Sequence, residues 1–306
     1  MISHNSYNGR PLRYIVFALP LLFLLSNGCG AGHNENDNML SEIPPKELPI
    51  PFQPVLVPDS VIIHRGIFSN DLREYYFTIS DRAFSNFRVL VSHRKQGVWT
   101  EPTAAFFNSP YNEHGMSFSP DGNTLVFSST RQVDNSEIPN TWHIWKCELK
   151  NGKWNELEYI EIPNLRNKLL SHPTLAPDGT MYFHASDLDY SNMAIYYTRL
   201  VDGQYQPAKK VMFENLDALG YCTPYLSATG EYLFFAAIGE SIDLYVCKKE
   251  NDNRWSDPTL LSAAINTKGQ GNPYLTPDSK YLFFAAEGES QQSWHVNWVS
   301  TSAFLE

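Results

Sequence analysis

The sequence has 306 residues and a formal net charge of −10 at pH 7, with 33 Asp and Glu against 23 Lys and Arg. Sequence-independent binding to phosphates requires a surplus of Lys and Arg, so this charge excludes nucleic acid as a partner. Hydrophobic residues make up 42% and aromatic residues 14% of the chain, which excludes global disorder and favours β-strands.

The chain begins with an export signal. After two arginines comes a nearly continuous apolar run (residues 14–25), which is too short for a comfortable membrane span. Gly28 directly precedes Cys29, and this pair resembles the processing site of bacterial lipoproteins, where the cysteine is acylated and becomes the new N-terminus. We therefore expect residues 1–28 to be a lipoprotein signal peptide and Cys29 to be lipidated. Ordinary signal cleavage nearby, which would release a soluble protein, is the alternative.

Residues 29–52 are polar and then rich in proline, which is the composition of a flexible tether. Gly30, and not an acidic residue, follows the cysteine, and by resemblance to lipoprotein sorting this favours the outer membrane. The expected location is thus the bacterial outer membrane, facing the periplasm or the cell surface. The lipid anchor is the expected membrane contact.

A four-residue turn between two apolar runs occurs five times. In its most regular copy, "FSPDGNTLVFSS" (residues 118–129), proline presets φ, aspartate bonds the local backbone and glycine ends the turn. The first turn residues, which lie 50, 57, 51 and 49 positions apart, are Ser69, Ser119, Ala176, Ser227 and Thr276. Because the repeat explains the aspartate, we interpret Asp121 and its equivalents as turn formers and not as catalytic acids.

Each copy continues into an apolar-aromatic strand and is sized for about four antiparallel strands. Such a sheet buries its faces only against other sheets, and radial stacking of sheets gives a β-propeller. The predicted fold class is therefore all-β, a five-bladed β-propeller over residues 53–306. The fifth copy reaches the end of the chain without its outer strand, whereas residues 51–60 resemble outer-strand segments. We expect this N-terminal strand to complete the last blade and close the ring.

With "LAPDGTMYFHAS" and "LTPDSKYLFFAA", the repeat resembles the Pro-Asp repeats of TolB-type, WD40-like β-propellers. The resemblance covers roughly residues 60–306. The sequence lacks the Gly-His and Trp-Asp marks of true WD40 repeats and the Ser-x-Asp-x-Gly-x-x-Trp box of sialidase propellers. The resemblance implies the fold, and because such propellers host many roles it implies no particular function.

Propellers bind ligands at the central funnel, where the innermost strand of each blade begins. The positions four to six residues before each first turn residue should surround this mouth. The polar side chains there, for which we predict a ligand-binding role, are His64, Arg65, Glu113, His114, His172, Tyr221, Gln270 and Asn272. The same cluster could form a polar, water-filled channel or bind a divalent metal. The sequence has neither His-x-His or His-Glu-x-x-His spacing nor a phosphate loop, so no metal and no cofactor is predicted.

The three cysteines after Cys29 are an odd number, which speaks against a disulfide framework. Cys147 and Cys247 occupy equivalent positions in blades that are not adjacent. We expect both to be small buried residues without a disulfide.

These features predict a non-catalytic, lipid-anchored binding or scaffolding propeller whose partner is a protein or a glycan of the cell envelope. No catalytic residue is predicted. The alternative is a carbohydrate-active hydrolase or lyase with its site in the funnel, using Glu113 and the funnel histidines. Glycoside hydrolysis usually needs two carboxylates, and the ring supplies only Glu113. Cys222 beside His114 or His172 could mimic a Cys/His nucleophile pair.

Overall fold

The computed structural model describes residues 43–52, 61–251, 254–267, 269–288 and 294–305. The predicted signal peptide, the lipidation site Cys29 and most of the predicted tether lie outside these residues. Within the described ranges, no helix combines the length and the apolar character needed to cross a membrane.

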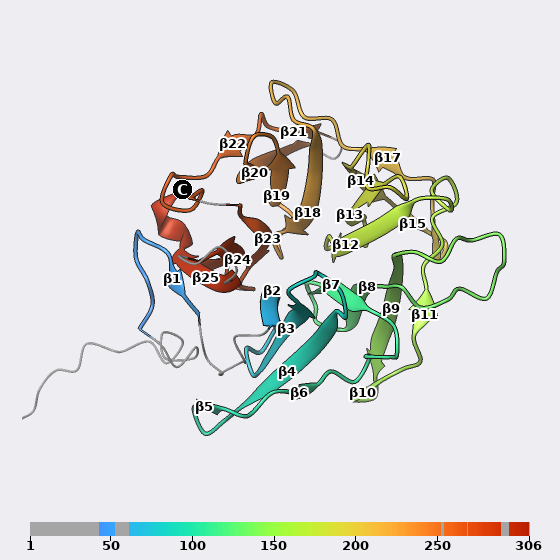
Figure 1. Ribbon diagram of the computed structural model, residues 1–306, viewed down its shortest axis with the longest axis horizontal. Coiled ribbons are helices and arrows are strands. Elements are labelled where there is room, and N and C mark those ends of the chain that lie inside the picture. Colours follow the sequence, from blue (N-terminus) through green and yellow to red (C-terminus); the bar gives the residue numbers. More distant parts are fainter. Residues whose placement is uncertain (1–42, 53–60, 252–253, 268, 289–293, 306) are drawn as a thin grey trace, which may run out of the picture. The chain divides into compact units, whose positions relative to one another are not determined.

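Five antiparallel sheets follow one another along the chain and surround a common centre (Figure 1). In every sheet the first strand lies nearest the centre, the second and third follow outward, and a short outer strand pairs with the third. The first, second and third strands are β2 (Val61–Phe68), β3 (Glu74–Asp81) and β4 (Arg88–Lys95) in blade 1; β7 (Glu113–Phe118), β8 (Thr124–Ser129) and β9 (His143–Lys150) in blade 2; β12 (Leu169–Leu175), β13 (Met181–Ser186) and β14 (Ala194–Thr198) in blade 3; β18 (Gly220–Leu226), β19 (Tyr232–Ile238) and β20 (Ile242–Asn251) in blade 4; and β23 (Gly271–Leu275), β24 (Tyr281–Glu287) and β25 (Trp294–Ser300) in blade 5.

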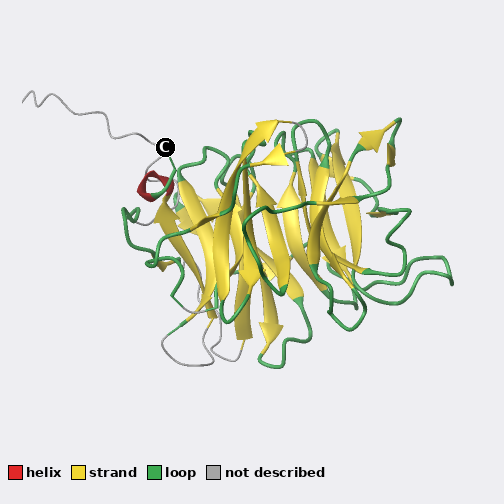
Figure 2. Cartoon of the chain, turned by 90° about the horizontal axis from the view of Figure 1, so that it is seen from above, coloured by secondary structure: helices red, strands yellow, loops and turns green. Residues whose placement is uncertain are grey.

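The outer strands are two residues long, and most blades carry two of them. They are β5 (Val98–Trp99) and β6 (Thr103–Ala104) in blade 1, β10 (Lys153–Trp154) and β11 (Glu158–Tyr159) in blade 2, β17 (Lys209–Lys210) in blade 3, β21 (Arg254–Trp255) and β22 (Thr259–Leu260) in blade 4, and β1 (Ile50–Pro51) in blade 5. A 3₁₀ turn, η2 (Thr301–Ala303), follows β25. Figure 2 shows the strands of the blades running between two loop-bearing faces. The predicted all-β, five-bladed propeller is confirmed.

The N-terminal segment closes the ring, as predicted. β1 pairs antiparallel with β25, with Ile50 opposite Trp298 and Pro51 opposite Asn297. The chain therefore supplies the outer strand of its last blade from its own N-terminal side. The strand lies at Ile50–Pro51, so it begins one residue before the predicted segment and falls within the range predicted as tether, residues 29–52. Residues 53–60 are outside the described part of the chain.

One hydrogen bond recurs in all five blades and ties each outer strand to its third strand. The residue that directly follows the outer strand donates its N–H to a third-strand carbonyl. The donor and acceptor pairs are Ala105 and Val89 at 3.0 Å, Ile160 and Ile144 at 2.9 Å, Val211 and Ile195 at 2.8 Å, Leu261 and Leu244 at 3.0 Å, and Phe52 and Val296 at 2.8 Å. Phe52 therefore occupies the position in blade 5 that the other four donors occupy in their own blades.

The repeated turn is built as its sequence predicts. Ser119 Oγ donates to Asp121 Oδ1 at 2.5 Å, and the same carboxylate accepts the N–H of Asn123 at 3.0 Å. These bonds lower the pKa of Asp121 below its usual value, with the Ser119 bond the largest cause. The matching bond from Thr276 to Asp278 spans 2.7 Å. Asp121 is therefore committed to the turn, which leaves it unsuited to proton transfer.

The two equivalent cysteines also follow the prediction. Cys147 on β9 and Cys247 on β20 are buried and have no disulfide partner. Both side chains belong to the apolar packing of their blades.

The closure between blades 5 and 1 depends on aromatic packing. The Phe52 ring is 97% buried and meets four rings edge-on, at centroid distances of 5.7 Å to Phe68, 5.2 Å to Tyr75, 5.1 Å to Phe283 and 5.5 Å to Trp298. Two of these rings belong to blade 1 and two to blade 5. Edge-to-face aromatic pairs add stability beyond the burial of their area.

We predict that Phe52→Ala lowers the free energy of unfolding by about 3–5 kcal/mol, because it leaves a cavity where the first and last blades meet. Chemical denaturation measures this loss. Phe106→Ala is the matched control: that ring is 49% exposed, so a loss below about 1 kcal/mol is expected. Equal losses for the two variants would contradict a special role for Phe52 in closure.

Candidate functional site

The innermost strands share a β-bulge at the same place in all five blades. Pairing with the second strand shifts between Ile63 and Gly66, His114 and Ser117, Ser171 and Thr174, Cys222 and Tyr225, and Gly271 and Tyr274. A bulge bends a strand and redirects its side chains. The funnel positions that the repeat predicts therefore coincide with a break in the regular ladder.

The residue four positions before the turn has left-handed backbone in four blades. Its φ is 60° at Gly115, 54° at His172, 46° at Thr223 and 55° at Asn272. A side chain in this region of φ costs of the order of 1–3 kcal/mol unless its surroundings enforce it. At Gly115, an added Cβ would approach the ring of His172 to 3.1 Å, so glycine lets blades 2 and 3 come together there.

The bulges bring six of the eight predicted residues to the wall of one central cavity of about 240 Å³. They are His64, Arg65, His114, His172, Gln270 and Asn272. Apolar residues contribute further parts of the wall, among them Phe84, Phe87, Cys222, Ile242 and Trp294. None of the described residues that line this cavity has a carboxylate, and Arg65 is the charged side chain among them.

The funnel histidines are held by serines. His64 Nε2 lies 2.7 Å from Ser80 Oγ. Ser171 Oγ lies 2.8 Å from His114 Nε2 and 3.0 Å from His172 Nδ1, so one hydroxyl joins two imidazoles whose ring centroids are 4.6 Å apart. The serines fix the orientations of these three rings.

Burial keeps these imidazoles neutral at pH 7. Desolvation lowers the pKa of His64 to about 4. It also places the pKa values of His114 and His172 well below the usual value, with the charges of neighbouring groups as lesser causes. A neutral imidazole can donate through one nitrogen and accept through the other. The cavity therefore offers hydrogen-bond partners of both kinds and one permanent positive charge.

A fourth histidine belongs to this cluster and was missed by the repeat alignment. His184 lies on the second strand β13, opposite Ser171, and its ring stacks on His172 at 5.1 Å. Its Nδ1 accepts the N–H of Thr223 at 3.2 Å, and burial lowers its pKa to about 3. The sequence did mark His184 as unusual. The equivalent second-strand positions in other blades carry small residues such as Ser128, so a histidine there stands out in the repeat alignment.

Arg65 is the most unusual group of the cavity. Its side chain is on the first strand of blade 1 and is 99% buried. Nη2 donates to the carbonyl of Pro224 in blade 4 at 3.2 Å, and the guanidinium lies 5.7 Å from the centre of the Tyr225 ring. Its Nε and Nη1 have no hydrogen-bond partner. Burial lowers the pKa of Arg65 to about 10, so the group is charged at pH 7.

Glu113 and Tyr221 do not line the cavity, although the repeat alignment groups them with the mouth. Both sit in strands, one residue before a cavity-lining position, and successive side chains of a strand point to opposite sides. Gln270 has the same alignment position but precedes β23, so this alternation does not apply to it. The Tyr221 hydroxyl donates to the carbonyl of Leu216 at 2.6 Å.

The Glu113 carboxylate is held mainly by residues close to it in the chain, and Arg88 of blade 1 lies 4.0 Å from its Oε2. Arg131 Nη2 lies 2.9 Å from Glu113 Oε1, Ser129 Oγ donates to the same oxygen at 3.1 Å, and Ser109 also donates to it. Glu113 is completely buried. Removal of one partner of a buried ion pair typically costs about 3–5 kcal/mol. Lost function in a Glu113 variant would thus report on folding and not on chemistry.

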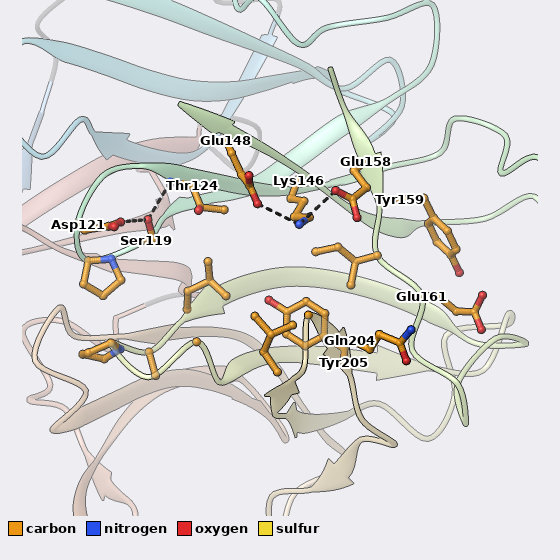
Figure 3. A pocket seen from close by; sticks show the side chains of 18 of the residues that line it. Ser119, Asp121, Thr124, Lys146, Glu148, Glu158, Tyr159, Glu161, Gln204 and Tyr205 are labelled. Atoms are coloured by element: carbon orange, nitrogen blue, oxygen red, sulfur yellow. Dashed lines mark hydrogen bonds and ion pairs between the residues drawn. The ribbon is translucent and has the colours of Figure 1, made fainter. Parts of the chain in front are cut away.

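A second, larger hollow of about 930 Å³ lies between blades 2 and 3 (Figure 3). Beside it, the third strand β14 ends at Thr198. The next strand, β15 (Leu200–Val201), pairs with β16 (Gln204–Tyr205) in a separate two-stranded sheet. In blades 2 and 4, by contrast, the third strand continues and pairs with β10 or β21.

Charged groups line the blade 2 side of this cleft. Lys146 Nζ lies 3.1 Å from Glu148 Oε1 and 3.2 Å from Glu158 Oε2, and Gln204 and Tyr205 face them across the cleft (Figure 3). Hydrogen bonds from Lys150 and Lys146 lower the pKa of Glu148. A general acid for glycoside hydrolysis needs a raised pKa, so the pKa of Glu148 is shifted in the opposite direction.

Comparison with known proteins extends to the fold alone. The sequence matches no protein-family model and no curated protein. Among solved structures, the chain is similar to a protein of unknown function from Dyadobacter fermentans, with a TM-score of 0.51, 10% identity, and coverage of 83% of this chain and 97% of that chain. The fold thus places the protein among β-propellers.

Two further similar structures carry functional names. TolB from Acinetobacter baumannii aligns with a TM-score of 0.47 and 16% identity over 77% of this chain and 54% of that chain. The Hadza microbial sialidase Hz136 aligns with a TM-score of 0.45 and 12% identity over 80% of this chain and 66% of that chain. The chain thus spans about half the length of this TolB. At such identities, no activity is transferred from either protein.

The buried histidines predict that stability falls as the pH drops from about 6.5 towards about 4. In the unfolded chain each imidazole binds a proton near its ordinary pKa of about 6.5, whereas folded His64 does so only near 4. Within this window the unfolded state holds more protons, so each such histidine removes roughly 1.4 kcal/mol per pH unit. Thermal unfolding across the window measures the slope.

His64→Gln should make this slope shallower by about 1.4 kcal/mol per pH unit, the contribution of one proton, because an amide does not titrate in this range. His93→Gln is the control, since that imidazole lies on the surface beside Glu74. A slope that His64→Gln leaves unchanged would show that His64 is protonated in the folded protein.

Proposed function

We propose that this protein is a non-catalytic binding module of the bacterial cell envelope, lipid-anchored through Cys29, whose partner is an envelope protein or glycan. The observation that carries the proposal is the placement of Glu113. This carboxylate was the acid available to a catalytic funnel, and it is completely buried against Arg131 outside the cavity wall. The described residues of the cavity wall therefore offer hydrogen bonds and a positive charge, and none of them is a carboxylic acid.

The funnel alternative, a carbohydrate-active hydrolase or lyase, finds no support in the cavity. Glycosidases place two carboxylates on either side of one sugar bond, about 5–10 Å apart. The described lining of the central cavity contains no carboxylate. The acids of the blade 2–3 cleft share Lys146 as a counter-ion, and the pKa of Glu148 is lowered.

A cysteine nucleophile is equally poorly supported. Burial raises the pKa of the Cys222 thiol to about 11, so the thiolate is scarce at pH 7. His172, its neighbour in the cavity wall, bonds Ser171 through Nδ1 and is held neutral by burial. A base that activates a thiol must instead approach it and accept its proton.

The two hollows suit a partner-binding role in different ways. The blade 2–3 cleft is broad and carries amide, phenol and carboxylate groups, which suit an extended glycan or a peptide segment. The central cavity is smaller, and apolar and imidazole groups make up much of its lining. A flexible tether after Cys29 would hold these surfaces at a distance from the lipid.

Binding without turnover is the first test. We predict that the purified protein binds envelope glycan fragments or an envelope protein and cleaves none of a panel of chromogenic glycosides. Glu148→Gln and Glu158→Gln remove the cleft acids without opening the core, and rates should stay at the uncatalysed background in both. Turnover that either substitution abolishes would contradict the proposal and establish the hydrolase.

Lipid anchoring is tested separately. Cys29→Ser should abolish incorporation of radiolabelled palmitate and move the protein from the membrane to the soluble fraction of the host cell. Cys222→Ser is the control and should stay labelled and membrane-bound. Labelling that persists in the Cys29 variant would rule out this residue as the anchor.

A further inference from the structure

We propose that the central cavity binds the carboxylate of a small organic acid, with Arg65 as the group that receives it. This inference deepens the proposed function, since it treats the cavity as a binding site and names its ligand class. It is carried by three observations: a buried arginine with unused donors, a cavity wall without a counter-ion, and an aromatic rim around the entrance.

The first observation is that Arg65 is buried with unpaired donors, which costs desolvation free energy in the protein without a ligand. A guanidinium has five N–H donors, yet Nε and Nη1 of Arg65 are buried without a partner. Its contact with the Pro224 carbonyl at 3.2 Å satisfies only one edge of the group. Buried charges normally persist only when they are paired, because the desolvation of an unpaired one is expensive. Since Nη2 uses one of its two hydrogens on Pro224, a carboxylate would place one oxygen on Nη2 and the other on the adjacent free nitrogen.

The second observation is the absence of an internal anion. The described residues that line the cavity with Arg65 include imidazoles and amides but no Asp or Glu. Glu113, the carboxylate that the repeat alignment groups with the funnel mouth, is paired with Arg131 at 2.9 Å. The positive charge of this cavity is therefore left for a ligand to balance.

The third observation is a gradient from an apolar entrance to a polar floor. Phe84 is 52% exposed and meets the Trp294 ring edge-on at 6.3 Å, whereas Arg65 is 1% exposed. The centroid of the Phe87 ring lies 5.1 Å from that of His64 and 5.2 Å from that of His114, so this ring contacts the histidines of the cavity. An acid with an apolar or aromatic body would enter with its carboxylate first.

The size of the cavity limits the ligand. About 240 Å³ is the share of roughly eight water molecules, which suits an acid of roughly ten non-hydrogen atoms. Gln270 adds a further requirement. Its Nε2 donates to Thr267 at 3.2 Å, while its buried Oε1 has no partner. A hydroxyl or N–H on the ligand would satisfy that oxygen.

The test compares an acid with its neutral amide. Isothermal titration calorimetry measures the affinity for phenylacetate and for phenylacetamide. The two ligands differ in charge and are similar in shape. We expect phenylacetate to bind at least about tenfold more tightly to the wild-type protein, which corresponds to about 1.4 kcal/mol. An added para-hydroxyl that improves binding would fit the free oxygen of Gln270. Equal affinity for acid and amide, or no measurable binding of either, would overturn the proposal.

A variant pair ties the binding to Arg65. Arg65→Met should abolish the preference for the acid and leave the melting temperature unchanged or higher, because an unpaired buried charge is removed. Arg73→Met, at a side chain 78% exposed, should keep the preference. If Arg65→Met does not fold, Arg65→Lys and the wild-type comparison still decide the question. A folded Arg65→Met protein that keeps the preference would refute the role of Arg65.

Two sources of the carboxylate are distinguished in the same assay. A free acid such as phenylacetate and an N-acetylated peptide that ends in phenylalanine present the same group, the second on a chain. Tighter binding of the peptide would indicate the C-terminus of a partner protein, and tighter binding of the free acid a small metabolite. Glycosidase turnover would contradict the proposed non-catalytic function without affecting the preference for the acid. Loss of that preference would contradict the ligand proposal without affecting lipid anchoring.

Discussion

The structure depends on one recurring constraint, that the third strand of each blade must be covered by an outer strand on its exposed edge. Four blades meet it with the segment that follows them in the chain, and the N–H of the next residue bonds the third strand each time. In the fifth blade this outer strand is β1, which comes from the N-terminal side of the chain. Phe52 then joins the first and last blades through rings from both. Closure converts a row of sheets with two open edges into a ring, and open edges are where strands pair wrongly.

The closed ring in turn creates the site. Five first strands converge on one centre, and all of them bulge at the same repeat position. The bulges redirect residues from separate blades into one cavity, where they are removed from water together. Burial makes the imidazoles neutral, and it leaves Nε and Nη1 of Arg65 without a hydrogen-bond partner. The chemical character of the cavity is thus a consequence of ring geometry acting on side chains that would be ordinary at a surface.

Most of the fold could be predicted from the sequence, because the information that specifies a repeat is local. Turn residues at regular spacing, apolar runs on both sides and an aromatic turn further on are legible without any long-range contact. The N-terminal closure could be predicted for the same reason, since residues 51–60 resemble the segment that the fifth copy lacks. The register of β1, which pairs Ile50 with Trp298, was less accessible, because two residues of strand carry little pattern of their own.

The site was accessible only in part. Repeat alignment located His64, Arg65, His114, His172, Gln270 and Asn272, because equivalent positions in a ring face the same axis. It could not separate Glu113 from them, since the side of a strand on which a residue falls depends on where the bulge interrupts the alternation. It also missed His184, which reaches the cluster from a second strand.

The sequence by itself determined the number of blades, the chemistry of the turns and the closure from the N-terminus, since these follow from patterns within or between neighbouring copies. Only the tertiary structure decided which polar groups share one cavity, which are paired and which are left without a partner. Pairing of Glu113 with Arg131 and isolation of Arg65 both depend on distances between atoms far apart in the chain. Such distances exist only once the ring has closed.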